Sequence, residues 1–169
     1  KGFYYDVDLG DATIGEEDLA KIEAEMKKIV KENLPIKPFV LPREEAIALM
    51  EERKESYKVE HIGDLDEDAV ISFYQQGEYI DMCVGPHLTY TKALKAFKLT
   101  KTSGAYWKND KNNKMLTRIY GIAFESQAEL DEYLRLLEEA ERRDHRKIGK
   151  EMNLFMMSEE GPGFPFFLP

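Results

Sequence analysis

The fold of this chain is decided by the stretch Val70-Ile71-Ser72-Phe73-Tyr74-Gln75-Gln76-Gly77-Glu78-Tyr79-Ile80-Asp81-Met82, in which two short runs of strand-forming residues flank a turn. Residues 70–75 and 78–82 carry apolar and aromatic side chains in partial alternation with polar ones, a pattern typical of half-buried strands. Gln76-Gly77 separates the runs, and glycine is favoured in the tight turns of hairpins. The stretch therefore predicts an antiparallel β-hairpin.

Further strands are predicted on both sides of this hairpin. Residues 2–9 pass from aromatic side chains into alternation, and residues 115–124 alternate into another strand. Shorter extended segments are predicted at 39–41, 56–62, 94–99 and 104–108, with turns at 63–68 and 109–113. Strands joined by short turns favour an antiparallel sheet over a parallel one.

Three helices are predicted where apolar residues recur at helical spacing. The first covers 16–32, and the second begins after Pro42 and ends near Lys54. Ser126 is a favoured N-cap residue, and a long third helix is expected from there to about Met152. The predicted fold class is α+β: an antiparallel sheet backed by helices, with a long C-terminal helix.

The composition is that of a soluble globular protein. Of the 169 residues, 43% are hydrophobic and 34% are charged. Apolar stretches fall short of the roughly 18 residues that a membrane span needs, and no secretory signal is recognisable. Cys83 is the single cysteine, so no disulfide can form within the chain, which indicates a reducing compartment such as the cytoplasm. The sequence opens at Lys1 inside a strand-like run, so we expect a piece of a longer polypeptide.

Charge is distributed unevenly along the chain. The net charge is −9, yet from Lys92 to Arg118 eight basic residues, here called the basic stripe, stand against one acid, Asp110. Such a segment could follow a phosphate backbone, or it could simply be a solvated face of the sheet. The residues predicted to contact RNA are Lys98, Lys101, Lys108, Lys111 and Arg118.

The densest group of reactive side chains is Asp81-Met82-Cys83-Val84-Gly85-Pro86-His87, at the end of a predicted strand and in the turn after it. A thiol and an imidazole four residues apart can converge on one point. They could form half of a zinc site, a nucleophilic pair, or polar groups that position a water molecule. Alternatively, Cys83 is only a small buried apolar residue.

Lys58 and Asp81 are two further candidates. In a regular strand Asp81 points to the same face as Cys83, and Lys58 lies in the predicted strand 56–62, which could pair alongside. A lysine in a partly dry cleft either has a lowered pKa or is held charged by a carboxylate. Otherwise Lys58 is a solvent-facing residue. The other histidines, His61 and His145, offer little to a metal, so no metal site is expected in this chain.

Several motifs together resemble the bacterial threonyl-tRNA synthetase family, in that family's order. They are Gly2-Phe3-Tyr4-Tyr5-Asp6, the stretch 81–87, Ala96-Phe97-Lys98-Leu99, Ser103-Gly104-Ala105-Tyr106-Trp107, Asn113-Lys114-Met115-Leu116, Arg118-Ile119-Tyr120-Gly121 and Arg143-Asp144-His145-Arg146-Lys147-Ile148-Gly149-Lys150. The resemblance implies three parts: most of the editing (second additional) domain at 1–125, a linker helix region at 126–158, and the start of the aminoacylation domain at 159–169.

The resemblance also implies a function and a set of residues. The family's editing domain hydrolyses serine that is wrongly esterified to the tRNA for threonine, because a pocket for threonine rejects serine by only about 1–3 kcal/mol. Its editing residues correspond to Lys58, Asp81, Cys83 and His87 here. The family completes them with a His-x3-His pair that this sequence does not contain, and many relatives carry Arg where Val84 stands.

The resemblance implies that this chain holds no cofactor but has several partners. The parent enzyme uses zinc, ATP and magnesium in its catalytic domain. Expected partners are tRNA(Thr) and the catalytic and anticodon-binding domains of the same polypeptide, in a homodimeric parent without membrane attachment. The competing hypothesis is a non-catalytic tRNA-docking and spacer module, in which the turn at 83–87 is merely structural. A metal-binding domain is a third hypothesis, which stoichiometric zinc in purified protein would reveal.

Overall fold

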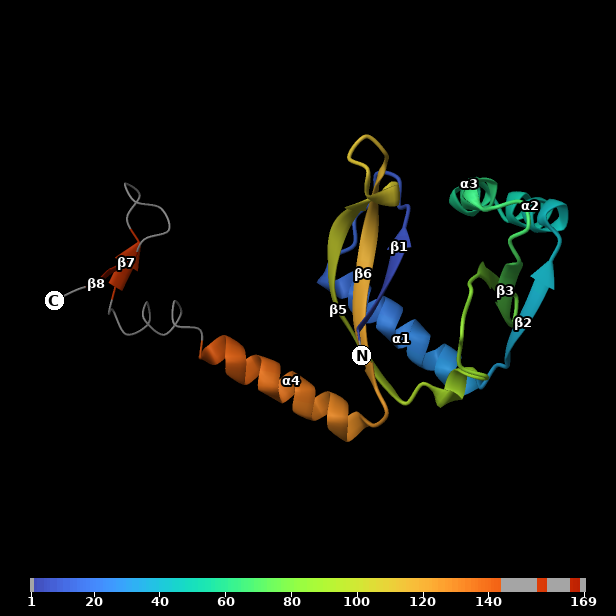
Figure 1. Ribbon diagram of the computed structural model, residues 1–169. Coiled ribbons are helices and arrows are strands. Elements are labelled where there is room, and N and C mark those ends of the chain that lie inside the picture. The colour runs from blue at the N-terminus through green and yellow to red at the C-terminus, as the bar shows by residue number, and fades with distance from the viewer. Residues whose placement is uncertain (1, 144–154, 158–164, 168–169) are drawn as a thin grey trace. The chain divides into compact units, whose positions relative to one another are not determined.

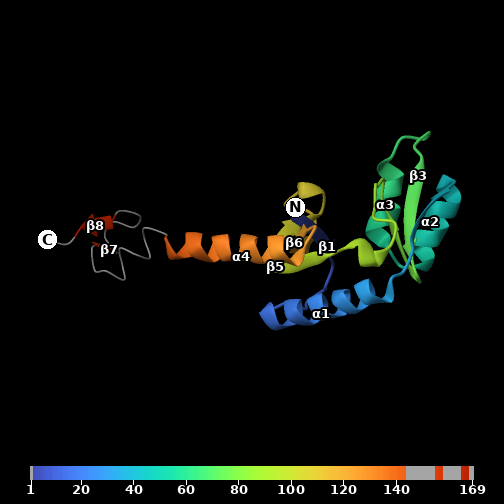
Figure 2. The same ribbon diagram turned by 90° about the horizontal axis from the view of Figure 1, so that it is seen from below.

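A computed structural model describes residues 2–143, 155–157 and 165–167. The chain divides into two compact units, Lys1–Ala123 and Phe124–Pro169, here called the first and second units. The fold is α+β, as predicted, with helices and antiparallel sheets in both views of the ribbon (Figures 1 and 2). The predicted boundaries after 125 and 158 stay predictions. His145 and the predicted helix beyond residue 143 lie outside the described residues.

One sheet of the first unit has the order β1-β6-β5. Its strands are β1 (Gly2–Val7), β6 (Met115–Phe124) and β5 (Ala96–Tyr106). β1 and β6 are antiparallel, with Tyr4 opposite Tyr120 and Asp6 opposite Arg118. The two extended segments predicted at 94–99 and 104–108 are wrong in detail. They form one continuous strand, which ends in the short 3-10 helix η2 (Trp107–Asn109).

The second sheet contains the predicted hairpin and has the order β2-β3-β4. Its strands are β2 (Ile36–Leu41), β3 (Ile71–Gln76) and β4 (Tyr79–Met82). Gln76 pairs with Tyr79, so the turn is Gly77-Glu78, one residue later than predicted. Gly77 has φ +59°, a value that suits glycine at the first position of a two-residue hairpin loop. β2 is longer than expected because it is an edge strand, where a proline such as Pro38 is tolerated.

The helices are α1 (Glu16–Glu32), α2 (Arg43–Glu52), α3 (Ser56–Asp64) and α4 (Gln127–Arg142). The bounds of α1 agree with the prediction, and Ser126 caps α4 by accepting the Glu129 N–H. The predicted strand at 56–62 is wrong. Val59, Ile62 and Leu65 recur at helical spacing and pack against the core, which makes this segment a helix. Because the segment is short, its partial alternation imitated a strand.

The core of the first unit lies between the second sheet and helices α2 and α3, which cover one face of that sheet (Figure 2). Its fully enclosed side chains are Ala46, Met50, Ile62, Ile71 and Phe73. Phe73 on β3 is completely buried and stacks on Phe39 of β2, with ring centroids 5.3 Å apart. Side chains alternate across a strand, so Ser72 and Tyr74 belong to the opposite face. Tyr74 pairs with Asp81, so the side chain of Asp81 shares that opposite face.

Side-chain contacts fasten α3 to the first sheet within the same unit. Tyr57 donates to the Asp8 carboxylate at 2.7 Å and lies against Trp107, with ring centroids 4.9 Å apart. The Trp107 indole N–H donates to Glu60 at 3.3 Å, and Lys108 forms ion pairs with Glu60 and Asp64. α3 is therefore held at both its beginning and its end, and Lys58 lies between these attachments.

In the second unit, β7 (Phe155–Met157) pairs with β8 (Pro165–Phe167) in an antiparallel arrangement. Ring contact between Phe124 and Tyr133 packs α4 against the residue that begins the unit. None of the helices in the described residues combines the length and apolar character required to cross a membrane.

Candidate functional site

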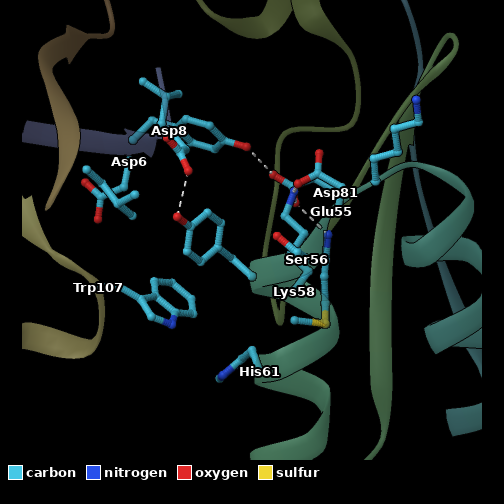
Figure 3. Close-up of a pocket in the computed structure, with 14 residues that line it drawn as sticks. Asp6, Asp8, Glu55, Ser56, Lys58, His61, Asp81 and Trp107 are labelled. Carbon is cyan, nitrogen blue, oxygen red and sulfur yellow. Dashed lines mark hydrogen bonds and ion pairs between the residues drawn. The ribbon is translucent and has the colours of Figure 1, made fainter. Parts of the chain in front are cut away.

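An ion pair between α3 and β4 is the centre of the candidate site. Lys58 Nζ lies 2.6 Å from Asp81 Oδ1, and each side chain is only 19% exposed (Figure 3). Lys58 also approaches Glu55 Oε2 at 3.4 Å. The structure thus brings together two residues 23 positions apart in the sequence, although Lys58 comes from a helix and not from the predicted strand.

Each carboxylate oxygen of Asp81 has two polar contacts. Oδ1 accepts the N–H of Met82 at 2.8 Å in addition to the Lys58 contact. Oδ2 accepts the phenol hydroxyls of Tyr5 at 3.0 Å and Tyr79 at 2.9 Å. A carboxylate offers about four lone-pair sites, and four groups contact this one. Asp81 is therefore an anchor and not a general base.

The charges of this pair are stabilised by one another. Burial by itself would lower the pKa of the Lys58 ammonium, but the hydrogen bond and charge of Asp81 outweigh it and raise that pKa above its ordinary value. Burial would likewise raise the pKa of the Asp81 carboxyl, yet Lys58, Tyr79 and Tyr5 bring it below its ordinary value. Both groups are charged at neutral pH, so Lys58 serves as a hydrogen-bond donor and not as a base.

Tyr5 and Tyr79 were missed by the sequence analysis. Their phenol oxygens lie 2.9 Å apart, and burial is the main cause that raises the pKa of both hydroxyls. Tyr79 stands two residues before Asp81 on the same strand, and the two-residue period could have placed it on the same face. Tyr5 lies 76 positions away from Asp81, and no local signal connects it with the hairpin.

The turn after β4 contains the other two candidates. Cys83 N–H donates to Ser72 O at 3.1 Å, and the Ser72 hydroxyl donates back to Cys83 O at 2.7 Å, which extends the pairing of β3 beyond Met82. The half-buried Cys83 thiol accepts the Gly85 N–H at 3.3 Å. The His87 ring stacks on Tyr74, with centroids 4.0 Å apart and planes 14° apart. Val84, in contrast, is 93% exposed.

A cavity of about 630 Å³ opens beside the ion pair (Figure 3). β1, α3 and β4 contribute to its walls, and Lys58, Asp81, His61 and Trp107 are among the residues that line it. Cys83 and His87 are not among its lining residues. A cavity of this size can receive a ligand as large as a nucleoside carrying a small ester group. Among the described residues, no group of three or more His, Cys, Asp or Glu side chains could hold a metal ion.

Half of the eight residues of the basic stripe are paired with acids from elsewhere in the chain. Lys98 lies 3.5 Å from Glu23, and Lys114 lies 2.8 Å from Asp8. Arg118 pairs with both oxygens of Asp6, at 2.7 and 2.9 Å. Lys108 is shared between two acids of α3, as described above.

Of the five residues predicted to contact RNA, two differ from these. Lys101 lies over the ring of Tyr120, with Nζ 5.1 Å from the ring centroid. For Lys111, no carboxylate partner is present within residues 2–143. The uncompensated positive charge of the five predicted RNA-contacting residues is therefore concentrated at Lys101 and Lys111.

Comparison with known proteins identifies similar sequences. Residues 71–120 match the model of the threonyl and alanyl tRNA synthetase second additional domain. Over 168 residues the chain is 63% identical to a threonine–tRNA ligase of Clostridioides difficile (strain 630) and 62% identical to one of Clostridium acetobutylicum. It is 60% identical to one of Clostridium novyi (strain NT). Almost the whole chain is therefore similar to a segment of threonine–tRNA ligases.

The match to threonine–tRNA ligases covers nearly all of this chain but only part of each relative. It includes 99% of this chain but 26% of each of these relatives, so the chain spans about a quarter of their length. The matched second additional domain begins at β3 and ends within β6. It contains Asp81, Cys83, His87 and the five predicted RNA-contacting residues, whereas Lys58 lies before it in α3.

Proposed function

We propose that this chain contributes the larger part of a site that hydrolyses the ester of seryl-tRNA(Thr). The observation that carries the proposal is the charged Lys58–Asp81 pair, directed at a cavity of about 630 Å³ in a chain that matches threonine–tRNA ligases. In the overall reaction, water adds to the ester carbonyl carbon and the bond to the ribose oxygen breaks. The products are free serine and tRNA with its terminal hydroxyl restored.

Lys58 is the group that stabilises developing negative charge. Its ammonium has donors beyond the one used by Asp81, and one of them can reach the ester carbonyl oxygen or the adjacent ribose hydroxyl. A donor fixed before the reaction stabilises an oxyanion better than one that must reorganise. Asp81 provides that fixation, because its own position is set by Met82, Tyr5 and Tyr79.

The water is oriented by the imidazole of His87 together with the family's His-x3-His pair, which this sequence does not contain. Cys83 stabilises the turn that carries His87, because its sulfur accepts the Gly85 N–H. No metal takes part in this scheme. The chain alone is therefore expected to hold only part of the water-activating machinery.

The relatives are ligases, so the wider setting is also proposed from them. The complete protein would ligate threonine to tRNA(Thr) with ATP and magnesium, and would carry zinc in its catalytic domain. It would act in the cytoplasm as a homodimer with anticodon-binding domains.

Deacylation by a full-length threonine–tRNA ligase that carries this segment tests the proposal. The Lys58→Met variant is expected to release serine from seryl-tRNA(Thr) about 100-fold or more slowly, the loss typical of one oxyanion-stabilising donor. Lys37→Met is the matched control, because Lys37 is an exposed residue on β2. Equal rates for the two variants would disprove the role of Lys58.

The second candidate function is a non-catalytic tRNA-docking and spacer module. It is favoured by one observation, the uncompensated charge at Lys101 and Lys111. If the parent enzyme with Lys58→Met and Asp81→Asn deacylates normally but binds tRNA less well after Lys101→Gln, docking is the function of this segment.

A further inference from the structure

The ring of His87 stacks on the ring of Tyr74. Tyr74 lies on β3 directly opposite Asp81, so its side chain emerges on the same face of the hairpin as Asp81. His87 is stacked on it almost in parallel, at 4.0 Å and 14°. We infer that Tyr74 is a positioning residue that fixes the orientation of the His87 imidazole, the group proposed to orient the water. This inference rests on the proposed function.

A second contact attaches the same turn to Tyr74. Gly85 has φ +78°, and a Cβ atom built there would overlap the phenol oxygen and approach Cζ of Tyr74 to 2.9 Å. Only glycine combines this backbone conformation with so close an approach. The turn therefore touches Tyr74 at two points, the backbone of Gly85 and the ring of His87.

β3 provides a rigid base for this arrangement. Phe73, the residue before Tyr74, is completely buried in the core on the other face. Ser72, one residue earlier, binds both the N–H and the carbonyl of Cys83. The turn from Cys83 to His87 is thus bound to β3 where it begins and where it ends. A movement of β3 would move Asp81 and His87 together. Lys58, which Asp81 holds, would then keep its position relative to His87.

The ring face of Tyr74, and not its hydroxyl, makes the contact. Within the part of the chain that the structure describes, no hydrogen bond involves the Tyr74 hydroxyl, whereas the two rings stack nearly in parallel. Phenylalanine should therefore replace tyrosine at this position, while an aliphatic residue should not. This distinction separates a positioning role from a general requirement for a large side chain.

Proton NMR of the present chain tests the stacking directly. The His87 ring protons are expected to be shifted upfield by the ring current of Tyr74, and the His87→Asn variant identifies them. The shift should persist in Tyr74→Phe and disappear in Tyr74→Leu and Tyr74→Met. Tyr133→Leu, in the second unit, is the control with the same chemical change. His87 signals without an upfield shift in the unmodified chain would overturn the inference.

Kinetics of the full-length ligase test the consequence. Tyr74→Phe should deacylate seryl-tRNA(Thr) within about threefold of the unmodified enzyme, and Tyr74→Leu should lose up to about 100-fold in kcat with little change in KM, as for a misplaced catalytic group. Circular dichroism establishes that each variant is folded, and Tyr74→Met replaces Tyr74→Leu if the latter is not. Normal kcat in a folded aliphatic variant would overturn the inference. If the NMR shifts behave as expected but the unmodified ligase does not deacylate seryl-tRNA, the proposed function fails while the stacking contact stands.

Discussion

Asp81 Oδ1 lies 2.6 Å from Lys58 Nζ, and the same carboxylate is bound by two phenols and a backbone N–H. The lysine comes from a helix and the aspartate from an edge strand, so the pair joins α3 to β4 beside the cavity. Because each oxygen of Asp81 already has two polar contacts, its effect on chemistry passes through Lys58. That dependence has measurable consequences.

Lys58 and Asp81 are expected to behave as one functional unit. In a full-length ligase, Lys58→Met and Asp81→Asn should each lower deacylation of seryl-tRNA(Thr). Once one partner is lost the other has little left to contribute, so the double variant should be much less impaired than the sum of the two losses, with a coupling of about 0.5–3 kcal/mol. Rates measured in single turnover decide the point. Additive losses would show that the two residues act independently.

The carboxylate of Asp81 should also make stability depend on pH. Its pKa is lowered in the folded chain, so it stabilises the fold above the ordinary carboxyl pKa of about 3.9, and that contribution is lost as the pH falls through the lowered value. Asp81→Asn removes the charge at every pH. The difference in unfolding free energy between the unmodified chain and Asp81→Asn should therefore be largest at neutral pH and shrink on acidification below about pH 4.

Urea unfolding between neutral pH and pH 3 measures this difference. Asp68→Asn is the matched control, because Asp68 is exposed in the loop before β3. A difference that stays constant with pH would mean that the charge of Asp81 contributes nothing to the fold.

The isolated chain should not release serine from seryl-tRNA(Thr) faster than buffer does. Its three histidines, His61, His87 and His145, include no His-x3-His pair, so the water-orienting set of the proposed site is incomplete. Mischarged tRNA incubated with the purified chain, followed by counting of free serine, tests this. Rapid turnover would show that Lys58, Asp81, Cys83 and His87 suffice.

The parts of this fold that could be predicted are those with a strong local cause. The 70–82 hairpin follows from a two-residue turn, α1 from a long amphipathic period, and the start of α4 from the Ser126 cap. α3 was missed because nine residues are too few to separate a helical period from alternation.

Candidate site residues could be named from the sequence only where a reactive side chain or a familiar motif marks them. Asp81, Cys83 and His87 stand in a recognised motif, and Lys58 was named by its chemistry and the resemblance. Tyr5, in contrast, reaches Asp81 through tertiary structure alone. The acids that compensate the basic stripe were invisible for the same reason: Asp6, Asp8, Glu23, Glu60 and Asp64 lie far from it in the sequence and reach it only through folding.

This compensation divides the basic stripe into two groups with different expected effects on tRNA binding. Lys101 and Lys111 have no carboxylate partner within residues 2–143, so neutralising either one should weaken binding to the full-length ligase. Each phosphate contact that is lost should reduce the slope of log affinity against log salt concentration by up to about 0.9. The preference among tRNAs should not change, because phosphate contacts position the RNA without reading its sequence.

Lys108→Gln should act differently, because the Lys108 ammonium already binds two carboxylates. Asp64 and Glu60 hold it by ion pairs and raise its pKa above the ordinary value. Loss of these contacts loosens the attachment of α3, on which Lys58 lies, so deacylation should fall while the salt slope stays nearly unchanged. Titration of labelled tRNA at several salt concentrations, beside single-turnover deacylation, separates the two effects. If the variants of Lys101, Lys111 and Lys108 all keep the salt slope of the unmodified ligase, the stripe does not contact the phosphate backbone. If Lys108→Gln alone reduces the slope, the ion pairs of Lys108 open when tRNA binds, and Lys101 and Lys111 are not the phosphate contacts.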